Sequence, residues 1–292
     1  MTLLIVAIVF LIVHYLRPSW PRLRQGLYDA FFRTSHALLA RVGLEGAAGF
    51  VLLVAIVVAA VAWLQVELAQ LAVTWPWFLF SLAALLLAWG GRDLDDDVET
   101  FLEATSDQDA RAAAAVLLHS YEPSTPGPEQ VIRGVFYQAL VRWFGVLFWF
   151  MVFGAAGAVA FRLPHALLSS AWLRERSAPD QFRLLRRLTR AIDYPPALLS
   201  VLALALIGNF DAVAGAWRAH REERGRRIVL DPELLPYIGL RLVGASGPAD
   251  EAFEDAYAGS RAPVAAAMSL LWRALIAWLT VIALLIIAGL AS

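Results

Sequence analysis

Residues 47–64 form a run of eighteen positions without a charged side chain. A bilayer core of about 30 Å requires an apolar helix of about 20 residues, so an uncharged run of this length indicates a membrane span. The whole chain agrees, since 60% of its 292 residues are hydrophobic and only 17% are charged. A soluble domain has about 25% charged residues. The sequence therefore predicts an all-α, polytopic membrane protein.

Six apolar runs define the expected membrane architecture. Four of them are predicted to span the bilayer, and they lie near residues 2–16, 47–64, 75–89 and 268–290. Two more, 143–161 and 194–207, are predicted to be re-entrant or half-buried, because glycines interrupt the first and the second has only 14 residues. Amphipathic cytosolic or interfacial helices are expected in the regions 17–46, 91–142, 162–193 and 208–267. Residues 1–292 are treated as one membrane domain.

The distribution of arginine predicts which regions face the cytosol. Cytosolic loops of membrane proteins carry an excess of basic residues, and all 24 basic residues of this chain are arginine. The 17–46 region has five of them and the 65–74 region has none, which makes the first cytosolic and the second periplasmic. If 143–161 and 194–207 both crossed fully, the seven arginines of 162–193 would be periplasmic. The rule favours the alternative in which neither crosses.

The strongest candidate site is a row of arginines that follows the helical repeat. Arg183, Arg186, Arg187 and Arg190 are spaced i, i+3, i+4, i+7 and therefore share one face of a helix. Guanidinium groups bind phosphate or carboxylate with two parallel hydrogen bonds, which makes this face a candidate anion site. The alternative is a surface helix that meets anionic lipid headgroups. Asp193, Arg218 and Arg221 are added to the candidate ligand-binding residues because they flank the next apolar run.

An acidic cluster is the second candidate, and it comprises Asp93, Asp95, Asp96, Asp97 and Glu99. Paired carboxylates could hold Mg²⁺ and a diphosphate, whereas acidic residues in the first turn of a helix also simply complement the helix dipole. The dipole interpretation is preferred, and no metal or other cofactor is predicted. The sequence contains no cysteine and no lysine. Disulfides, thiolate metal sites and a standard P-loop are therefore excluded, and nothing indicates a nucleic-acid partner.

Two local predictions concern helix ends. The apolar positions from Phe101 to Leu117 predict a continuous helix after the acidic cluster. Asn209 is expected to cap the start of the helix that follows the second membrane-depth run, because asparagine side chains accept hydrogen bonds from the first free N–H groups of a helix.

Several blocks of the sequence resemble the AmpE family and, more distantly, the CbiB/CobD synthases of the cobalamin pathway. They are Asp29-Ala-Phe-Phe-Arg33, Leu147-Phe-Trp149 with the following glycines, and Asp193-Tyr-Pro-Pro196 continuing to Ala205-Leu-Ile-Gly208. The AmpE resemblance implies a bacterial inner-membrane protein that links cell-wall muropeptide turnover to β-lactamase expression, with components of the AmpD pathway as partners. The synthases carry a Glu-Asn…Asp block where this chain has Tyr137, Gln138 and Arg142.

These observations lead to two functional hypotheses. The first is a regulatory or sensory protein, without proven catalysis, that binds an anionic ligand or lipid at the arginine face. The second is a membrane enzyme, a ligase or hydrolase on a lipid-linked or peptidoglycan-derived substrate, which shares its descent with the cobalamin synthases. The expected partners are the lipid bilayer and an anionic lipid or small anion, and a homodimer is left open.

Overall fold

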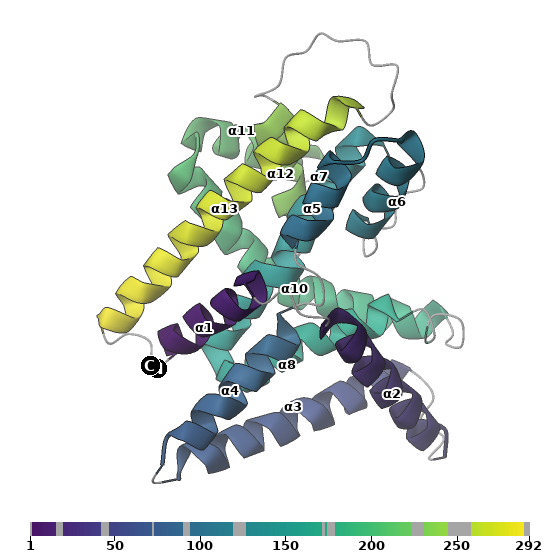
Figure 1. The fold of residues 1–292 in the computed structure, drawn as a ribbon, viewed down its shortest axis with the longest axis vertical. Helices are drawn as coiled ribbons and strands as arrows, with labels where there is room; N and C mark the ends of the chain where they lie inside the picture. Colours follow the sequence, from purple (N-terminus) through teal and green to yellow (C-terminus); the bar gives the residue numbers. More distant parts are fainter. Residues whose placement is uncertain are drawn as a thin grey trace. The chain divides into compact units, whose positions relative to one another are not determined.

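The chain is helical throughout the part that the computed structural model describes, and no strand occurs in that part. It comprises residues 2–15, 20–41, 47–71, 73–89, 94–118, 127–170, 173, 179–223, 231–244 and 258–288. The all-α prediction is therefore confirmed. Where the sequence leads us to expect one domain, the chain divides into two compact units (Figure 1). Unit 1 comprises Met1–Gly91, Gly145–Ile192 and Ile282–Ser292, and unit 2 comprises Arg92–Phe144 and Asp193–Val281.

Unit 1 is built around the longest apolar helices of the first half of the chain. Its elements are α1 (Thr2–Tyr15), α2 (Trp20–Arg41), α3 (Ala47–Ala69), α4 (Trp75–Ala88), α8 (Gly145–Ser169) and the first half of α10 (Pro179–Ile207). Both α3 and α4 pack against α8, and α1 packs against α4. One apolar cluster joins four of these helices through Phe32 of α2, Phe50 of α3, Leu167 of α8 and Leu185 of α10.

Helix α8 is folded back on itself at Gly154. This glycine has φ 65° and ψ −144° in the middle of an otherwise helical segment. A Cβ atom at Gly145 would lie 2.0 Å from Cζ of Phe161, so these two residues are neighbours in space. In a straight helix their sixteen-residue separation would place them about 24 Å apart. Residues 145–153 and 155–169 therefore form the two arms of a helical hairpin.

The turn of this hairpin is closed by a glutamine from a neighbouring helix. Gln65 of α3 accepts a hydrogen bond from the backbone N–H of Ala156 (3.1 Å) and donates one to the carbonyl oxygen of Phe153 (3.3 Å). These are backbone groups that lose helical partners where the helix breaks. Because lipid offers no hydrogen bonds, a broken helix at membrane depth needs such partners from protein. The predicted interruption of the 143–161 run is present, and a side chain 91 positions earlier satisfies it.

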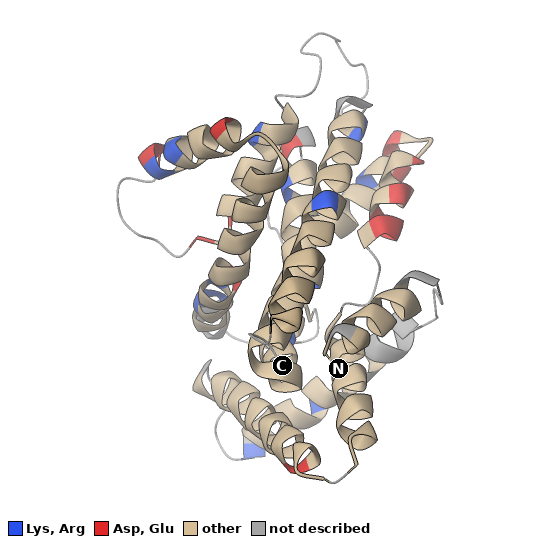
Figure 2. Ribbon diagram, turned by 90° about the vertical axis from the view of Figure 1, so that its left-hand side faces the viewer, with Lys and Arg blue, Asp and Glu red and all other residues tan. Residues whose placement is uncertain are grey.

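Unit 2 consists of shorter helices and the second half of α10. Its elements are α5 (Leu94–Leu102), α6 (Asp107–Leu117), α7 (Pro128–Ala139), the π-helix η1 (Leu140–Phe144), α11 (Phe210–Glu223), α12 (Leu234–Gly244) and most of α13 (Ala258–Ile287). Helix α12 packs on both α7 and α11, and α5 packs on α6. In Figure 2, acidic and basic segments gather on α5, α6 and α11, whereas α3 and α4 are almost free of them.

The structure tests the two local predictions of helix ends. The Asn209 cap is confirmed, because its Oδ1 accepts a hydrogen bond from the N–H of Ala212 (3.1 Å). The continuous helix from Phe101 to Leu117 is wrong, because α5 ends at Leu102 and α6 begins at Asp107. Ser106 explains the break: its backbone is extended and its Oγ accepts a hydrogen bond from the N–H of Asp109, which is the geometry of a helix N-cap.

Within the described residues, four helical stretches have the length and composition needed to cross a membrane, which matches the predicted number. They are Ala48–Ala69, Glu129–Ser169, Phe182–Ile207 and Ser260–Ile287. The first and last contain most of the predicted spans 47–64 and 268–290, and the middle two contain the segments predicted to be re-entrant. The predicted spans 2–16 and 75–89 form helices of 14 residues each. Which of these helices cross the bilayer stays a prediction.

Candidate functional site

The arginine face predicted from the sequence lies on the surface of α10 in unit 1. Arg183, Arg186, Arg187 and Arg190 are all exposed, while Leu185 on the same helix is 2% exposed and packs in the apolar cluster of unit 1. Leu184 and Leu188 of the same helix are each 39% exposed. The surface of α10 therefore carries arginines and leucines side by side. This composition is typical of helices that lie at a membrane interface.

The three other predicted ligand-binding residues do not join this surface within unit 1. Asp193 is 1% exposed and begins the part of α10 that belongs to unit 2. Arg218 and Arg221 are exposed on α11, also in unit 2, where Nε of Arg218 donates to the carbonyl oxygen of Ala214 (3.3 Å). The predicted residues that lie together in unit 1 are thus the four arginines of α10, and their role as a binding site stays a prediction.

Two carboxylates of the acidic cluster accept hydrogen bonds from side chains of unit 2. Asp95 accepts a hydrogen bond from Nε1 of Trp272 (2.8 Å), and Asp97 accepts one from Nη1 of Arg142 (2.7 Å). Asp93 lies outside the described residues. Among the residues that are described, no group of three or more His, Asp or Glu side chains is arranged to hold a metal ion. The carboxylates therefore tie α5 to η1 and α13 by side-chain contacts.

Arg142 is the centre of a buried polar network in unit 2. Its side chain is 12% exposed and that of its partner Asp97 is 1% exposed. Its Nε donates to Oε1 of Gln138 (3.0 Å), and Nε2 of Gln138 in turn donates to the carbonyl oxygen of Leu117 (3.1 Å). This network links α5, η1, α7 and α6. Gln138 and Arg142 belong to the segment that, by the resemblance, corresponds to the Glu-Asn…Asp block of the synthases.

The π-helix that carries Arg142 is a second notable feature of the same region. A π-helical turn contains one more residue per hydrogen-bonded ring than an α-helix, and such turns occur frequently at functional sites. Its neighbour Trp143 packs against Trp272 with ring centroids 5.4 Å apart. The indole of Trp272 also donates to Asp95. The packing of Trp143 on Trp272 and the ion pair between Arg142 and Asp97 together hold η1 in one orientation, with Arg142 directed toward α5.

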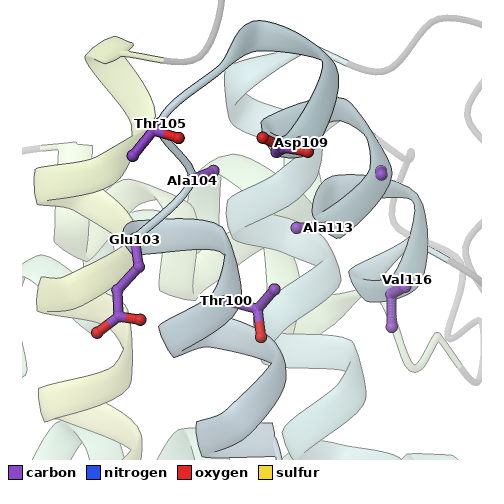
Figure 3. A pocket seen from close by; sticks show the side chains of 8 residues that line it. Thr100, Glu103, Ala104, Thr105, Asp109, Ala113 and Val116 are labelled. Carbon is purple, nitrogen blue, oxygen red and sulfur yellow. The ribbon is translucent and has the colours of Figure 1, made fainter.

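Between α5 and α6 the structure has a cavity of about 490 Å³, shown in Figure 3. Glu103 and Asp109 contribute carboxylates to its lining, and Thr100 and Thr105 contribute hydroxyl groups. Asp109 also accepts a hydrogen bond from Oγ of Ser106 (2.7 Å), and Nη2 of Arg261 donates to the carbonyl oxygen of Ala104 beside the cavity. The cavity is open to solvent, and none of the arginines of α10 lines it.

Sequence reasoning missed a polar cluster between α11 and α12. Nε2 of His220 lies 3.1 Å from Oδ2 of Asp231, and both residues are 8% exposed. The ring of Tyr237 lies 4.6 Å from the His220 ring, and its hydroxyl donates to Oε1 of Glu223 (2.8 Å). Nη2 of Arg241 donates to the same hydroxyl (3.0 Å). Asp231 lies beyond the end of α11 at Glu223, so the helical pattern that places His220 gave no signal of their contact.

Burial raises the pKa of Tyr237 above the ordinary tyrosine value of 10.0, and the hydrogen bond to Glu223 raises it further. The neighbouring Arg241 acts in the opposite direction, because its positive charge favours the phenolate. The folded cluster therefore favours the neutral phenol of Tyr237 over the phenolate. These contacts attach α12 to α11, and they give the cluster a structural role.

One curated protein has a clear similarity to this chain: the "Cobalamin biosynthesis protein CobD" of Chromobacterium violaceum, which is 30% identical over 190 residues. The matched region covers 63% of this chain and 58% of that relative, so the chain spans little more than half the length of the protein that it matches. No family model matches the sequence, and no solved structure matches it. The match supports the CbiB/CobD part of the resemblance and gives no support to the AmpE part.

Proposed function

We propose that this chain is a non-catalytic membrane protein that binds an anionic group, a phosphate or a carboxylate, at the arginine face of α10. The observation that carries the proposal is the exposure of Arg183, Arg186, Arg187 and Arg190 on one helix whose buried residue Leu185 anchors it in unit 1. Four guanidinium groups at helical spacing can engage the oxygens of one or more anions bidentately.

The wider role that we propose rests on the sequence blocks that resemble AmpE. In that role the protein resides in the bacterial inner membrane and couples muropeptide turnover to β-lactamase expression, with components of the AmpD pathway as partners. Its support is the resemblance of residues 29–33, 147–149 and 193–208 to that family. Deletion of the gene in its host should change the induction of β-lactamase by a cell-wall antibiotic. Unchanged induction would refute this regulatory role and leave the anion site untouched.

Anion binding can be tested on the purified protein. Native mass spectrometry of the wild-type protein should show retained phospholipid or another anionic adduct, and the double substitution Arg186→Gln and Arg187→Gln should reduce its occupancy several-fold. Arg111→Gln provides the control, because Arg111 is an exposed arginine of α6 that already forms an ion pair with Asp107. Equal retention by all three proteins would exclude the arginine face as the site.

The similarity to CobD favours a second candidate, an enzyme of cobalamin biosynthesis. Against it stands the network around Arg142, which donates hydrogen bonds to both Gln138 and Asp97. The carboxylate of Asp97 is thus already paired with Arg142 in the fold, which argues against its use in synthase chemistry. We therefore expect that the gene does not restore growth of a bacterial strain that lacks its own CobD on medium requiring cobalamin synthesis. Restored growth would establish the enzymatic function.

A further inference from the structure

We infer that the arginine face of α10 lies on the same side of the membrane as the arginines of α2, and that together they contact the phosphate headgroups of that leaflet. This inference rests on the proposed anion binding. It adds the side of the membrane on which the anion lies and names the lipid headgroups as the source of the anion. We call this set of exposed side chains the basic surface. It comprises Arg33, Arg41, Arg183, Arg186, Arg187 and Arg190.

Helix α3 provides the length scale for the argument. Its 23 residues contain an uncharged stretch that runs from Ala47 to Val66. From Phe50 to Gln65 it rises by about 22 Å at 1.5 Å per residue, which is most of the bilayer core of about 30 Å. Leu185 of α10 packs in the cluster that contains Phe50, whereas the turn of α8 is held by Gln65. The arginine helix and the turn of α8 therefore lie at opposite ends of α3.

The second arm of α8 connects these two ends. It runs from Ala155, beside Gln65, to Leu167, which packs with Phe50 in the apolar cluster. Twelve residues of helix rise by about 18 Å, which agrees with the distance along α3. The arm thus runs antiparallel to α3 and brings the chain back to the end where α3 begins. The first arm approaches the turn from the opposite direction, so the chain enters and leaves through the same end of this unit.

The composition of the hairpin fits a location inside the bilayer. No charged residue occurs from Gly145 to Phe161. At the turn, Val152 and Phe153 are 50% and 58% exposed, so the tip presents apolar side chains to its surroundings. The backbone N–H of Ala156 and the carbonyl oxygen of Phe153, which lose helical partners at the turn, form hydrogen bonds with Gln65. A re-entrant segment in lipid requires both an apolar exterior and internally satisfied backbone groups.

This geometry removes a conflict in the charge distribution. A single crossing by 143–161 would place the seven arginines of 162–193 opposite to the five of 17–46, against the tendency of basic residues to stay cytosolic. A hairpin leaves both groups on one side, and the apolar cluster joins α2 and α10 at that side through Phe32 and Leu185. Basic residues near an anionic membrane surface are attracted to its headgroups.

Exposed leucines identify the bilayer, rather than a soluble anion, as the source of the phosphate groups. Leu38 of α2 is 55% exposed, and Leu184 and Leu188 of α10 are each 39% exposed, next to the arginines. A site for a soluble anion needs only the guanidinium groups, whereas an interfacial helix combines basic residues with apolar ones that enter the acyl region. The mixture of both on α2 and α10 favours headgroups as the occupant.

Single-cysteine labelling tests the side of the membrane. The protein contains no cysteine, so Arg187→Cys, Arg41→Cys and Leu71→Cys each create a unique site on exposed positions of α10, α2 and the turn after α3. Intact cells are treated with a membrane-impermeant maleimide, and a second sample is treated after the membrane is opened. We expect Arg187→Cys and Arg41→Cys to react only in opened membranes and Leu71→Cys to react in intact cells.

Three results would overturn the inference. Labelling of Arg187→Cys in intact cells would place α10 on the side of the α3–α4 turn. Identical behaviour of Arg41→Cys and Leu71→Cys would show that α3 does not cross. Labelling of Arg187→Cys only after denaturation would show that the arginine face is not at an aqueous surface. None of these results depends on anion binding, so they are distinguishable from failure of the proposed function.

A second experiment tests the partner. The protein is placed in nanodiscs of phosphatidylcholine, with or without phosphatidylglycerol, and its thermal unfolding is followed. We expect phosphatidylglycerol to raise the Tm, and we expect the Arg186→Gln and Arg187→Gln double variant to lose at least half of that shift, while Arg111→Gln keeps it. Inorganic phosphate added to phosphatidylcholine discs should not reproduce the shift. An equal effect of free phosphate, or equal shifts in all variants, would refute the headgroup assignment.

Discussion

Replacement of Gln65 by leucine provides a direct test of how the α8 hairpin is held. The substitution keeps a similar volume and removes both hydrogen bonds, the one from Ala156 N–H and the one to Phe153 C=O. The two backbone groups then have no partner where the helix is broken. A buried backbone group left unsatisfied costs about 1–3 kcal/mol, while side-chain hydrogen bonds in membrane proteins contribute about 0.6 kcal/mol on average. We expect the free energy of unfolding to fall by about 1–3 kcal/mol in total.

The assay is equilibrium unfolding in mixed micelles of a mild detergent and sodium dodecyl sulfate, followed by tryptophan fluorescence. Gln70→Leu is the matched control, because Gln70 is exposed at the end of the same helix and a surface substitution there should change stability by less than about 0.5 kcal/mol. Gln65→Glu keeps an acceptor for Ala156 and loses the donor to Phe153, so it should not retain full stability. If Gln65→Leu and Gln70→Leu unfold at the same denaturant concentration, Gln65 does not hold the turn.

Three further perturbations have defined outcomes. Gly157→Ala should destabilise the protein by about 2 kcal/mol or more, because its Cβ would lie 2.0 Å from a main-chain oxygen of the first arm. Arg142→Met should cost about 3–5 kcal/mol in the same unfolding assay by leaving the Asp97 carboxylate buried without its cation, and adding Asp97→Leu should recover most of the loss. Glu223→Gln should lower the raised pKa of Tyr237, as measured by ultraviolet absorbance of the phenolate, because it weakens an interaction that favours the neutral phenol.

Each of these has a control or a contrary result that would refute its reasoning. Gly215→Ala should be neutral or stabilising, because a Cβ there meets no atom within 4 Å, so equal loss in both glycine variants would exclude the close approach as the cause. If the double variant Arg142→Met, Asp97→Leu is as unstable as Arg142→Met alone, the buried charge of Asp97 is not the cause of the lost stability. For Tyr237, the raised pKa means that its stabilising contribution is present below the ordinary value and is lost as pH rises through the folded value. If the contact between α11 and α12 is equally stable at high pH, the predicted loss of the Tyr237 contribution is wrong.

Local patterns in the sequence were sufficient for the membrane character, the helical class and the helix ends that depend on one side chain. Hydrophobicity acts on each segment independently, so the uncharged run 47–64 could be identified without knowledge of its neighbours. Helical periodicity placed the four arginines of α10 on one face, and the structure leaves all of them exposed. The Asn209 cap depends on residues three positions apart and was predicted for the same reason. The break at Ser106 was equally local, but the alanine-rich apolar repeat around it obscured the signal.

Tertiary structure alone decided which distant side chains satisfy buried polar groups. The partners Gln65 and Ala156 are 91 positions apart, and Arg142 and Asp97 are 45 positions apart. No periodicity relates such pairs, because their contact depends on how the helices pack after they have formed. The interruption of α8 was visible in its glycines, but the sense of the bend and its closure by α3 required the packing of Phe161 against Gly145. Sequence pattern specifies each helix through interactions within a few turns, and only burial of those helices against one another brings together groups that are far apart in the chain.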